Sequence, residues 1–273
     1  MMDDLQWKKN LVVVRGGGDI ATGTIAKLYQ CGFPLLILET ANPSCIRRTI
    51  SFCKAVSEQE MVVEGIKAKK AESLEEAYKI YQQGNVPLMV DEEGFLIKMI
   101  RPTVVIDAIL AKKNLGTKIT DAPIVIGLGP GFTAGEDVHA VIETKRGHDL
   151  GRVIYEGTAI ANTGIPGIIG GYGKERVIHA PFSGKWHIRK KIGEIVEKGE
   201  VIACVNEHPV TAAISGVLRG TIREGYPVKK GLKVADIDPR IAEQENCYRI
   251  SDKARCVAGG VLEAILHLEK RQS

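Results

Sequence analysis

The chain has 273 residues, of which 44% are hydrophobic and 26% charged; these values are ordinary for globular proteins and exclude a disordered or fibrous chain. Lys and Arg outnumber Asp and Glu by 37 to 33, and a net charge of +4 is too small to indicate nucleic-acid or membrane-surface partners. No apolar run approaches the roughly 20 residues of a membrane span. The acidic N-terminal residues argue against a signal peptide, and the six cysteines show no disulfide-framework spacing. We therefore expect a soluble, cytoplasmic protein.

The first clear element is an apolar run at residues 11–14, typical of a strand buried on both faces. A glycine-rich segment at 16–23 follows, and then a helical pattern that ends at Gly32, where a positive φ is needed. Residues 35–38 form a second apolar strand, closed by Glu39. This order of strand, turn, helix and strand predicts a βαβ unit.

The turn of this unit reads Gly16-x-Gly18-x-x-Ala21, a dinucleotide-binding fingerprint. Gly16 permits the tight turn, Gly18 the approach of a pyrophosphate to backbone N–H groups, and Ala21 close packing of helix and strand. Glu39, at the end of the second strand, is placed to accept hydrogen bonds from a ribose diol. The alternative is a glycine-rich turn in a domain without a nucleotide. Nucleotide binding is favoured because the glycine loop, the helix that follows it and Glu39 all fit the same fingerprint.

Asp19 complicates this interpretation, because its charge beside a phosphate is costly unless a basic group lies nearby. Asp19 is also a suitable N-cap for the helix. Arg47 and Arg48 are candidates for a phosphate contact, and the alternative is a solvated basic pair.

Strands and helices alternate through the middle of the chain, which predicts a mostly parallel sheet covered on both faces. The expected elements are short strands near 62–63 and 66, a helix opened by the capping box at Ser73, strands at 86–90, 104–106 and 124–126, and a short helix at 108–113.

A second glycine loop, Gly127-x-Gly129-x-Gly131, follows the strand at 124–126. It can expose successive N–H groups to an anion, and at the carboxyl end of a strand it would share a crevice with the first loop. A simple turn is the alternative. Five polar residues that follow are candidates to line the same crevice: His139, Glu143, Lys145, Arg146 and His148.

The predicted ligand-binding residues are Gly16, Gly17, Gly18, Asp19, Ile20, Ala21, Glu39, Gly127, Gly129 and Gly131. The expected ligand is a nucleotide-containing molecule, either an NAD-type dinucleotide or the molybdopterin cofactor. No HExxH or paired CxxC pattern is present, so we expect no zinc site. The sequence identifies no catalytic residue.

An internal repeat with a constant offset of 32 residues occupies the region after about residue 170. Ser183-Gly184 recurs as Ser215-Gly216, and Val196-Glu197-Lys198-Gly199 recurs as Val228-Lys229-Lys230-Gly231. This offset predicts two copies of one β unit that pack on each other.

The repeat, over residues 177–238, resembles the barrel-sandwich fold of biotinyl and lipoyl domains. Its clearest motifs are residues 180–184 and 212–216. Carrier domains of that kind place a modifiable lysine on the hairpin between the repeats, whereas residues 201–228 contain no lysine. We therefore expect a scaffold or docking module that carries neither biotin nor lipoate.

These patterns together predict an α/β chain in three segments. Residues 1–170 form a Rossmann-like, mostly parallel sheet that binds a nucleotide, and residues 171–240 form the small β barrel-sandwich module. Residues 241–273 form a C-terminal helical segment, because apolar residues over 251–270 follow helical spacing after an N-cap at Ser251.

Six segments carry further specific motifs: residues 14–23 (VRGGGDIATG), 105–114, 126–132, 142–148, 162–167 and 250–255. They resemble the YqeB-like accessory proteins of selenium-dependent molybdenum hydroxylase systems, and the resemblance extends over about residues 10–266. It implies a role in the maturation of molybdenum hydroxylases and a Rossmann-like half similar to that of xanthine dehydrogenase accessory proteins. It carries over no catalytic residue.

Three functions are compatible with these features. The preferred one is a maturation factor that binds a nucleotide or molybdopterin-type phosphate ligand in the glycine-loop crevice and hands it to an apo-molybdenum hydroxylase or another maturation protein. The second is an NAD(P)-dependent oxidoreductase of unknown substrate. The third is a non-enzymatic protein that binds a partner when a nucleotide is present, and an oligomer is compatible with each.

Overall fold

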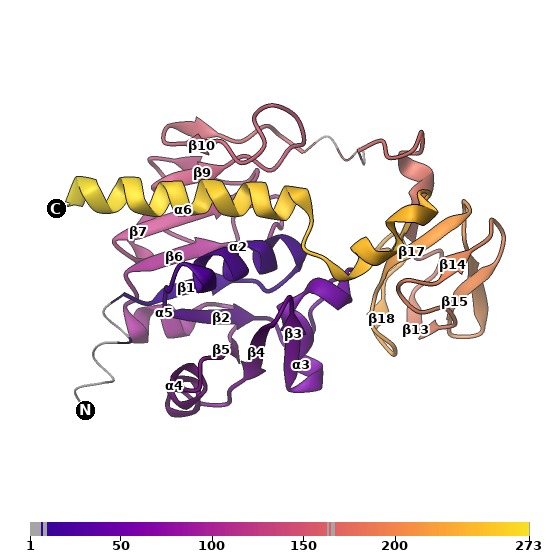
Figure 1. Ribbon diagram of the computed structural model, residues 1–273, viewed down its shortest axis with the longest axis horizontal. Helices are drawn as coiled ribbons and strands as arrows, with labels where there is room; N and C mark the ends of the chain where they lie inside the picture. The colour runs from indigo at the N-terminus through magenta and orange to yellow at the C-terminus, as the bar shows by residue number, and fades with distance from the viewer. Residues whose placement is uncertain (1–6, 8–9, 163, 165–166, 273) are drawn as a thin grey trace. The chain divides into compact units, whose positions relative to one another are not determined.

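The structure is a computed structural model that describes residue 7, residues 10–162, residue 164 and residues 167–272 (Figure 1). The chain divides into two compact units. Unit 1 comprises residues 1–43, 51–162 and 250–273, and unit 2 comprises residues 44–50 and 163–249. The sequence predicted three consecutive segments with boundaries at residues 170 and 240. The structure has two units instead, because the C-terminal helix packs within unit 1. Residues 163, 165 and 166, in the motif segment 162–167, lie outside the described residues.

Unit 1 is built on a nine-stranded sheet with the order β10-β9-β7-β6-β1-β2-β5-β4-β3. The strands are β1 (Val12–Arg15), β2 (Leu35–Glu39), β3 (Glu60–Val63), β4 (Ile66–Lys70), β5 (Val86–Val90), β6 (Val104–Asp107), β7 (Ile124–Leu128), β9 (Ala140–Ile142) and β10 (Val153–Ile154). Neighbouring strands from β9 to β4 run parallel, and only the edge strands β10 and β3 pair antiparallel. The prediction of a mostly parallel α/β sheet is therefore confirmed.

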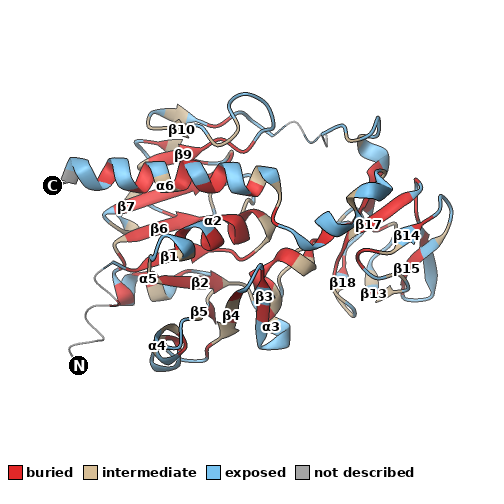
Figure 2. Cartoon of the chain, viewed as in Figure 1, coloured by how far each residue is buried: buried red, intermediate tan, exposed pale blue. Residues whose placement is uncertain are grey.

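Helices cover both faces of this sheet. On one face, α2 (Asp19–Gln30) and α6 (Asp252–Gln272) run side by side (Figure 1), and a Cβ on Gly23 of α2 would lie only 2.7 Å from the Cβ of Ala254. The core of the other face includes residues of α4 (Leu74–Gln82) and α5 (Phe95–Ile100). Burial of α6 is confined to one side, and its other side is exposed (Figure 2). None of the described helices is both long and apolar enough to span a membrane.

Local signals predicted some of these elements well. The hydroxyl of Ser73 accepts a hydrogen bond from Glu76 N at 3.2 Å, so α4 begins at the predicted capping box. The predicted helix at 108–113 is wrong: this segment is a loop in which Leu110 and Lys112 have φ of 59° and 65°. Such left-handed residues interrupt a right-handed helix.

The remaining described elements of unit 1 are small. They are η2 (Phe52–Lys54), α3 (Ala55–Glu58), η3 (Ile119–Asp121) and a two-stranded ribbon of β8 (Thr133–Ala134) and β11 (Gly157–Thr158).

Unit 2 consists of two four-stranded antiparallel sheets, ordered β12-β19-β17-β14 and β16-β15-β13-β18. The strands are β12 (Val177–His179), β13 (Gly184–Ile188), β14 (Ile195–Val196), β15 (Val201–Val205), β16 (His208–Thr211), β17 (Gly216–Thr221), β18 (Pro227–Val228) and β19 (Lys233–Asp238). The starts of β13, β14 and β15 lie 32 residues before those of β17, β18 and β19. The repeat seen in the sequence therefore relates the two sheets strand by strand.

The two sheets of unit 2 enclose their own core, which includes Trp186, Ile202, Val210 and Val234. The repeat predicts that its apolar residues lie inside this module, and all of them are buried except the half-buried Ile188: Val177, Ile178, Ile188, Val196, Ile202, Val210, Ile214, Val217, Val228 and Val234. That the module carries neither biotin nor lipoate stays a prediction. The described residues of unit 2 also form three short 3-10 helices: η1 (Arg48–Ile50), η4 (Lys174–Arg176) and η5 (Ile241–Tyr248).

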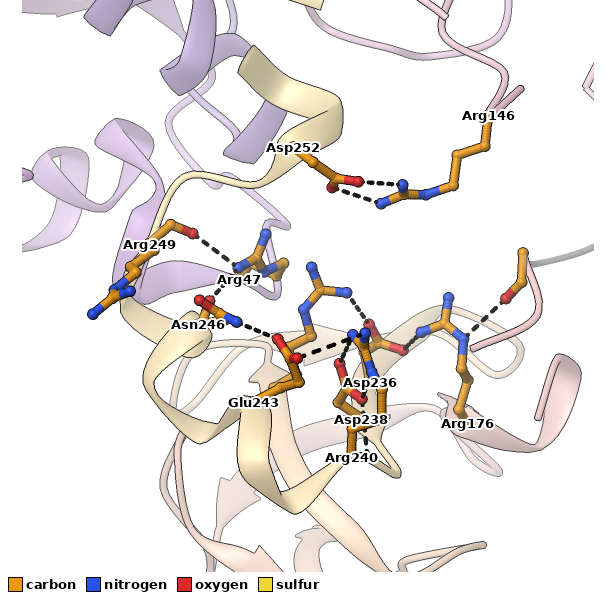
Figure 3. Close-up of polar contacts among 12 residues, drawn as sticks. Arg47, Arg146, Arg176, Asp236, Asp238, Arg240, Glu243, Asn246, Arg249 and Asp252 are labelled. Carbon is orange, nitrogen blue, oxygen red and sulfur yellow. Dashed lines mark hydrogen bonds and ion pairs between the residues drawn. The ribbon is translucent and has the colours of Figure 1, made fainter. Parts of the chain in front are cut away.

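Two aspartates of β19 in unit 2 form ion pairs with arginines (Figure 3). Asp236 pairs with Arg176 and Arg219, and Asp238 with Arg240. Burial acts to raise the pKa of Asp238, but the hydrogen bonds and charge of Arg240 outweigh it, so this pKa lies below its usual value.

Candidate functional site

The glycine loop connects the carboxyl end of β1 to α2. Gly16 has a φ of +96°, a conformation that favours glycine. At Gly17, a Cβ would lie 2.8 Å from the backbone nitrogen of Cys53, whose N–H donates to Gly17 O at 2.8 Å. At Gly18, by contrast, a Cβ would meet no atom within 4 Å. Gly16 and Gly17 are thus required by the loop itself, whereas Gly18 leaves room for a ligand.

Gly18 is also the N-cap of α2, so Asp19 is the first residue of the helix and not its cap. The N–H groups of the first helical turn, which includes Asp19, Ile20 and Ala21, have no partner inside the helix. A carboxylate at this end interacts favourably with the helix dipole. The side chain of Ala21 is fully buried, as close packing of the helix on the sheet requires.

Glu39, at the end of β2, lies against the glycine loop. Its Oε2 accepts a hydrogen bond of 2.7 Å from Gly17 N, and its Oε1 accepts one of 2.8 Å from Thr40 N. Burial raises the pKa of Glu39 above its usual value, although both N–H groups act to lower it, and the nearby charge of Glu92 raises it further. The structure therefore brings the predicted ribose acid and the predicted phosphate loop together.

A buried polar cluster lies at the carboxyl ends of β1 and β6, the central strands of the sheet. Arg15 and Asp107 are directly opposite in the register of these strands, with Arg15 NH1 3.5 Å from Asp107 Oδ2. The Thr117 hydroxyl donates a hydrogen bond of 2.6 Å to the same Asp107 oxygen, and it accepts one of 2.5 Å from Arg15 NH1. Burial raises the pKa of Asp107, against the lowering effects of Thr117 and Arg15.

The second glycine loop, at the end of β7, is closely packed. A Cβ on Gly127 would contact the Phe132 ring, one on Gly129 would lie 2.6 Å from Thr144 Oγ1, and one on Gly131 would lie 2.7 Å from Lys113 Cα. Close packing around the second glycine loop therefore explains why glycine occupies these three positions. An anion contact through their backbone stays a prediction.

The polar residues after this loop are not all at the crevice. His139 Nδ1 accepts a hydrogen bond of 3.0 Å from Val125 N, near the amino end of β7, and burial lowers the pKa of His139. Glu143 is buried, and its two oxygens accept N–H groups of Lys145 at 2.7 Å and Ile160 at 2.8 Å. Arg146 pairs with Asp252 at the start of α6 (Figure 3).

Arg47 and Arg48 belong to unit 2. Arg47 donates to the carbonyls of Asn246 and Arg249, and Arg48 to the carbonyl of Thr221. Within the described part of the chain, no group of three or more His, Cys, Asp or Glu side chains is placed to hold a metal ion.

The sequence also contains a signal of the buried polar cluster that lies outside the glycine motifs. Arg15 and Asp107 each end an otherwise apolar strand, and opposite charges at such positions indicate a buried pair across neighbouring strands. Lys253 gave no comparable signal, because its place beside Asp19 depends on the packing of α6 against α2.

The chain is similar in part to several solved structures. The product-bound ectoine utilization protein EutE (DoeB) from Ruegeria pomeroyi shares 13% identity, with 84% of this chain and 85% of that chain covered and a TM-score of 0.25. The succinylglutamatedesuccinylase/aspartoacylase from Rhodobacter sphaeroides shares 14% identity, with 84% and 85% covered and a TM-score of 0.27. Scores this low say nothing about the fold or activity of this chain.

A sequence relative gives the more informative comparison. No protein-family model matches the chain. The uncharacterized protein YqeB of Escherichia coli (strain K12) is 50% identical over 258 residues, which are 94% of this chain and 48% of that protein. The chain thus spans about half the length of the curated relative it matches. This similarity supports the YqeB-like label that the sequence motifs predict.

Proposed function

We propose that unit 1 binds a nucleotide-containing ligand, either an NAD-type dinucleotide or a molybdopterin-type cofactor, at the glycine loop. The observation that carries the proposal is the geometry of Gly18, the open N-cap of α2, next to a Glu39 carboxylate held by Gly17 N. Backbone N–H groups at such a helix start bind phosphates, and a carboxylate at the end of the neighbouring strand binds a ribose.

The order of the parallel strands supports this proposal. Strands β5-β2-β1-β6-β7-β9 follow the 3-2-1-4-5-6 order of Rossmann-like sheets, if the β3–β4 hairpin is counted as an insertion before β5. The order reverses at β1, whose carboxyl end leads into the glycine loop. Ligands of open α/β sheets bind at this switch point.

We further propose that the protein is an accessory factor in the maturation of selenium-dependent molybdenum hydroxylases. Support comes from the six motif segments and from the 50% identity to a YqeB protein. In this role, unit 1 would hold the phosphate ligand and unit 2 would contact an apo-hydroxylase or another maturation protein. An NAD(P)-dependent oxidoreductase and a non-enzymatic, nucleotide-dependent binding protein remain the alternatives.

Thermal unfolding in the presence of NAD, NADP, ADP, CTP, GTP and molybdopterin forms tests the binding proposal. A ligand at 100 times its Kd stabilises the folded state by about 2.7 kcal/mol, which is easily measured. We expect at least one compound to raise the unfolding temperature. If none does, the glycine loop is only a turn.

A second measurement separates the accessory role from the alternatives. In the proposed role, the loaded protein restores activity to an apo-molybdenum hydroxylase without turning over the ligand. Reduction of bound NAD by a small substrate would favour the oxidoreductase instead. Failure of the loaded protein to bind or activate any hydroxylase would contradict the accessory role.

A further inference from the structure

The start of α6 is fixed beside the glycine loop by contacts on both sides of Lys253. The preceding residue, Asp252, forms two hydrogen bonds with Arg146, of 2.7 and 3.0 Å (Figure 3). The following residue, Ala254, packs on Gly23 of α2. Asp19 lies four residues before Gly23 and therefore on the same side of α2. Lys253 is thus positioned next to the first turn of α2, although more than 230 residues separate it from the loop in sequence.

Lys253 is half-buried and lies within electrostatic range of several charged groups. Burial lowers the pKa of Lys253, and the charge of Arg146 lowers it further, while Asp19, Glu143 and Asp252 raise it. Two of these carboxylates already have partners on both oxygens: Glu143 with backbone N–H groups, and Asp252 with Arg146. Asp19 is the carboxylate of this group that belongs to the first turn of α2, so Lys253 carries its positive charge beside the start of that helix.

A phosphate on Gly18 would bring negative charge close to Asp19. This arrangement is costly unless a cation lies nearby. We infer that Lys253 is a ligand-binding residue of unit 1, which contacts the phosphate of a nucleoside diphosphate or dinucleotide and offsets the charge of Asp19. This inference rests on the proposed function and extends it, because it assigns the cation of the site to α6 and requires a ligand that carries phosphate.

Titration calorimetry with ADP, GDP and CDP and with the corresponding nucleosides tests the role of Lys253. Lys253→Gln should weaken the binding of the diphosphate that the parent binds by about tenfold to a hundredfold, the range expected for a lost charge-assisted hydrogen bond. Nucleoside affinity should not change, because a nucleoside has no phosphate. Lys253→Arg should keep most of the diphosphate affinity, since it keeps the charge.

Lys27, in the last turn of α2, provides the matched control. Lys27→Gln removes the same charge from the exposed opposite end of the same helix, and it should bind like the parent. If Lys253→Gln loses diphosphate and nucleoside affinity equally, the lysine only supports the fold. If Lys253→Gln binds the diphosphate as tightly as the parent does, the inference about Lys253 is overturned and the proposed function is not. A parent that binds neither these nucleotides nor any compound used in the thermal unfolding experiment overturns the proposed function and the inference together.

Discussion

Glu39 Oε2 accepts a hydrogen bond of 2.7 Å from the backbone N–H of Gly17. The carboxylate at the end of β2 is therefore hydrogen-bonded directly to the glycine loop that follows β1. The other oxygen is held by Thr40 N. With both oxygens oriented by backbone groups, Glu39 keeps one position relative to Gly18 before any ligand arrives. Ordering of this kind reduces the entropy cost of binding.

Gly18→Val should abolish nucleotide binding and leave the fold intact. The valine side chain would occupy the space next to the start of α2 that a pyrophosphate needs, while its Cβ would meet no protein atom within 4 Å. Loss of the glycine N-cap should cost at most about 1 kcal/mol of stability. Calorimetry measures the binding and circular dichroism the fold, and undiminished binding would show that the loop is only a turn.

Gly17→Ala is the contrasting variant. Its Cβ would lie 2.8 Å from Cys53 N, so the loop or residues 51–54 must move. We expect a loss of stability of about 1–3 kcal/mol, which is typical of overpacking. A fully stable Gly17→Ala protein would contradict the tight contact between these segments.

Glu39 should make the site prefer NAD to NADP. A 2′-phosphate would bring like charge to a carboxylate that already has Glu92 as a neighbour. Like charges placed together in an interface cost several kcal/mol, so the preference should be tenfold or greater. Glu39→Gln should reduce the preference without reversing it. Tighter binding of NADP than of NAD by the parent would remove Glu39 from the ribose site.

The unliganded protein should become less stable, relative to Glu39→Gln, as the pH rises. Burial raises the pKa of Glu39 above 4.5, so the folded state favours the protonated acid. The stability that this group contributes is therefore fully present below pH 4.5 and is lost as the pH rises through the folded pKa. Urea denaturation of both proteins from pH 4.5 to neutral measures the difference. If the difference in unfolding free energy between the two proteins does not change with pH, the pKa of Glu39 is not raised in the folded state.

The sequence predicted the sheet better than the loops at its edge. Apolar runs such as residues 12–14 and 124–126 have no polar side chain to present to water, so a strand buried on both faces is their natural structure. The loop at 108–113 was predicted as a helix because its composition suits one. Its left-handed residues Leu110 and Lys112 have side chains that ordinarily avoid this conformation, so composition could not reveal them.

The candidate site was predictable only where it is local in sequence. Residues 16–21 and Glu39 belong to one βαβ unit, and short connections place them together. Lys253 and Arg146 reach the same region through α6 and the loop after β9, and only tertiary packing determines that approach. Spacing also could not separate Gly17, which the fold requires, from Gly18, which it does not.

Arg15 and Asp107 should behave as one buried unit. Arg15→Met leaves Asp107 buried without its cation, and we expect a loss of about 3–5 kcal/mol of stability. The double variant Arg15→Met with Asp107→Leu should recover much of that loss, because no unpaired charge remains. A double-mutant cycle by urea denaturation gives the coupling between the two residues. Additive losses would mean that they do not stabilise each other.

Ser183 and Ser215 should contribute equally to the stability of unit 2, because the 32-residue repeat gives them equivalent contacts. Ser183 Oγ accepts the N–H of Lys230 at 3.0 Å, and Ser215 Oγ accepts the N–H of Lys198 at 2.9 Å. Each Ser→Ala change removes one exposed hydrogen bond and should cost about 0.5–1.5 kcal/mol. Ser→Thr at either position keeps the hydroxyl and serves as the control.

Tryptophan fluorescence can follow unit 2 separately in this experiment. The chain has two tryptophans, Trp7 in unit 1 and Trp186 in the core of unit 2, so Trp7→Phe leaves Trp186 as the reporter. In this background, Ser183→Ala and Ser215→Ala should shift the urea midpoint of the Trp186 signal by similar amounts. The two serines lie in symmetry-related turns, and both shifts come from the same lost contact. A large shift for one serine and none for the other would show that the repeat is equivalent in topology but not in energy.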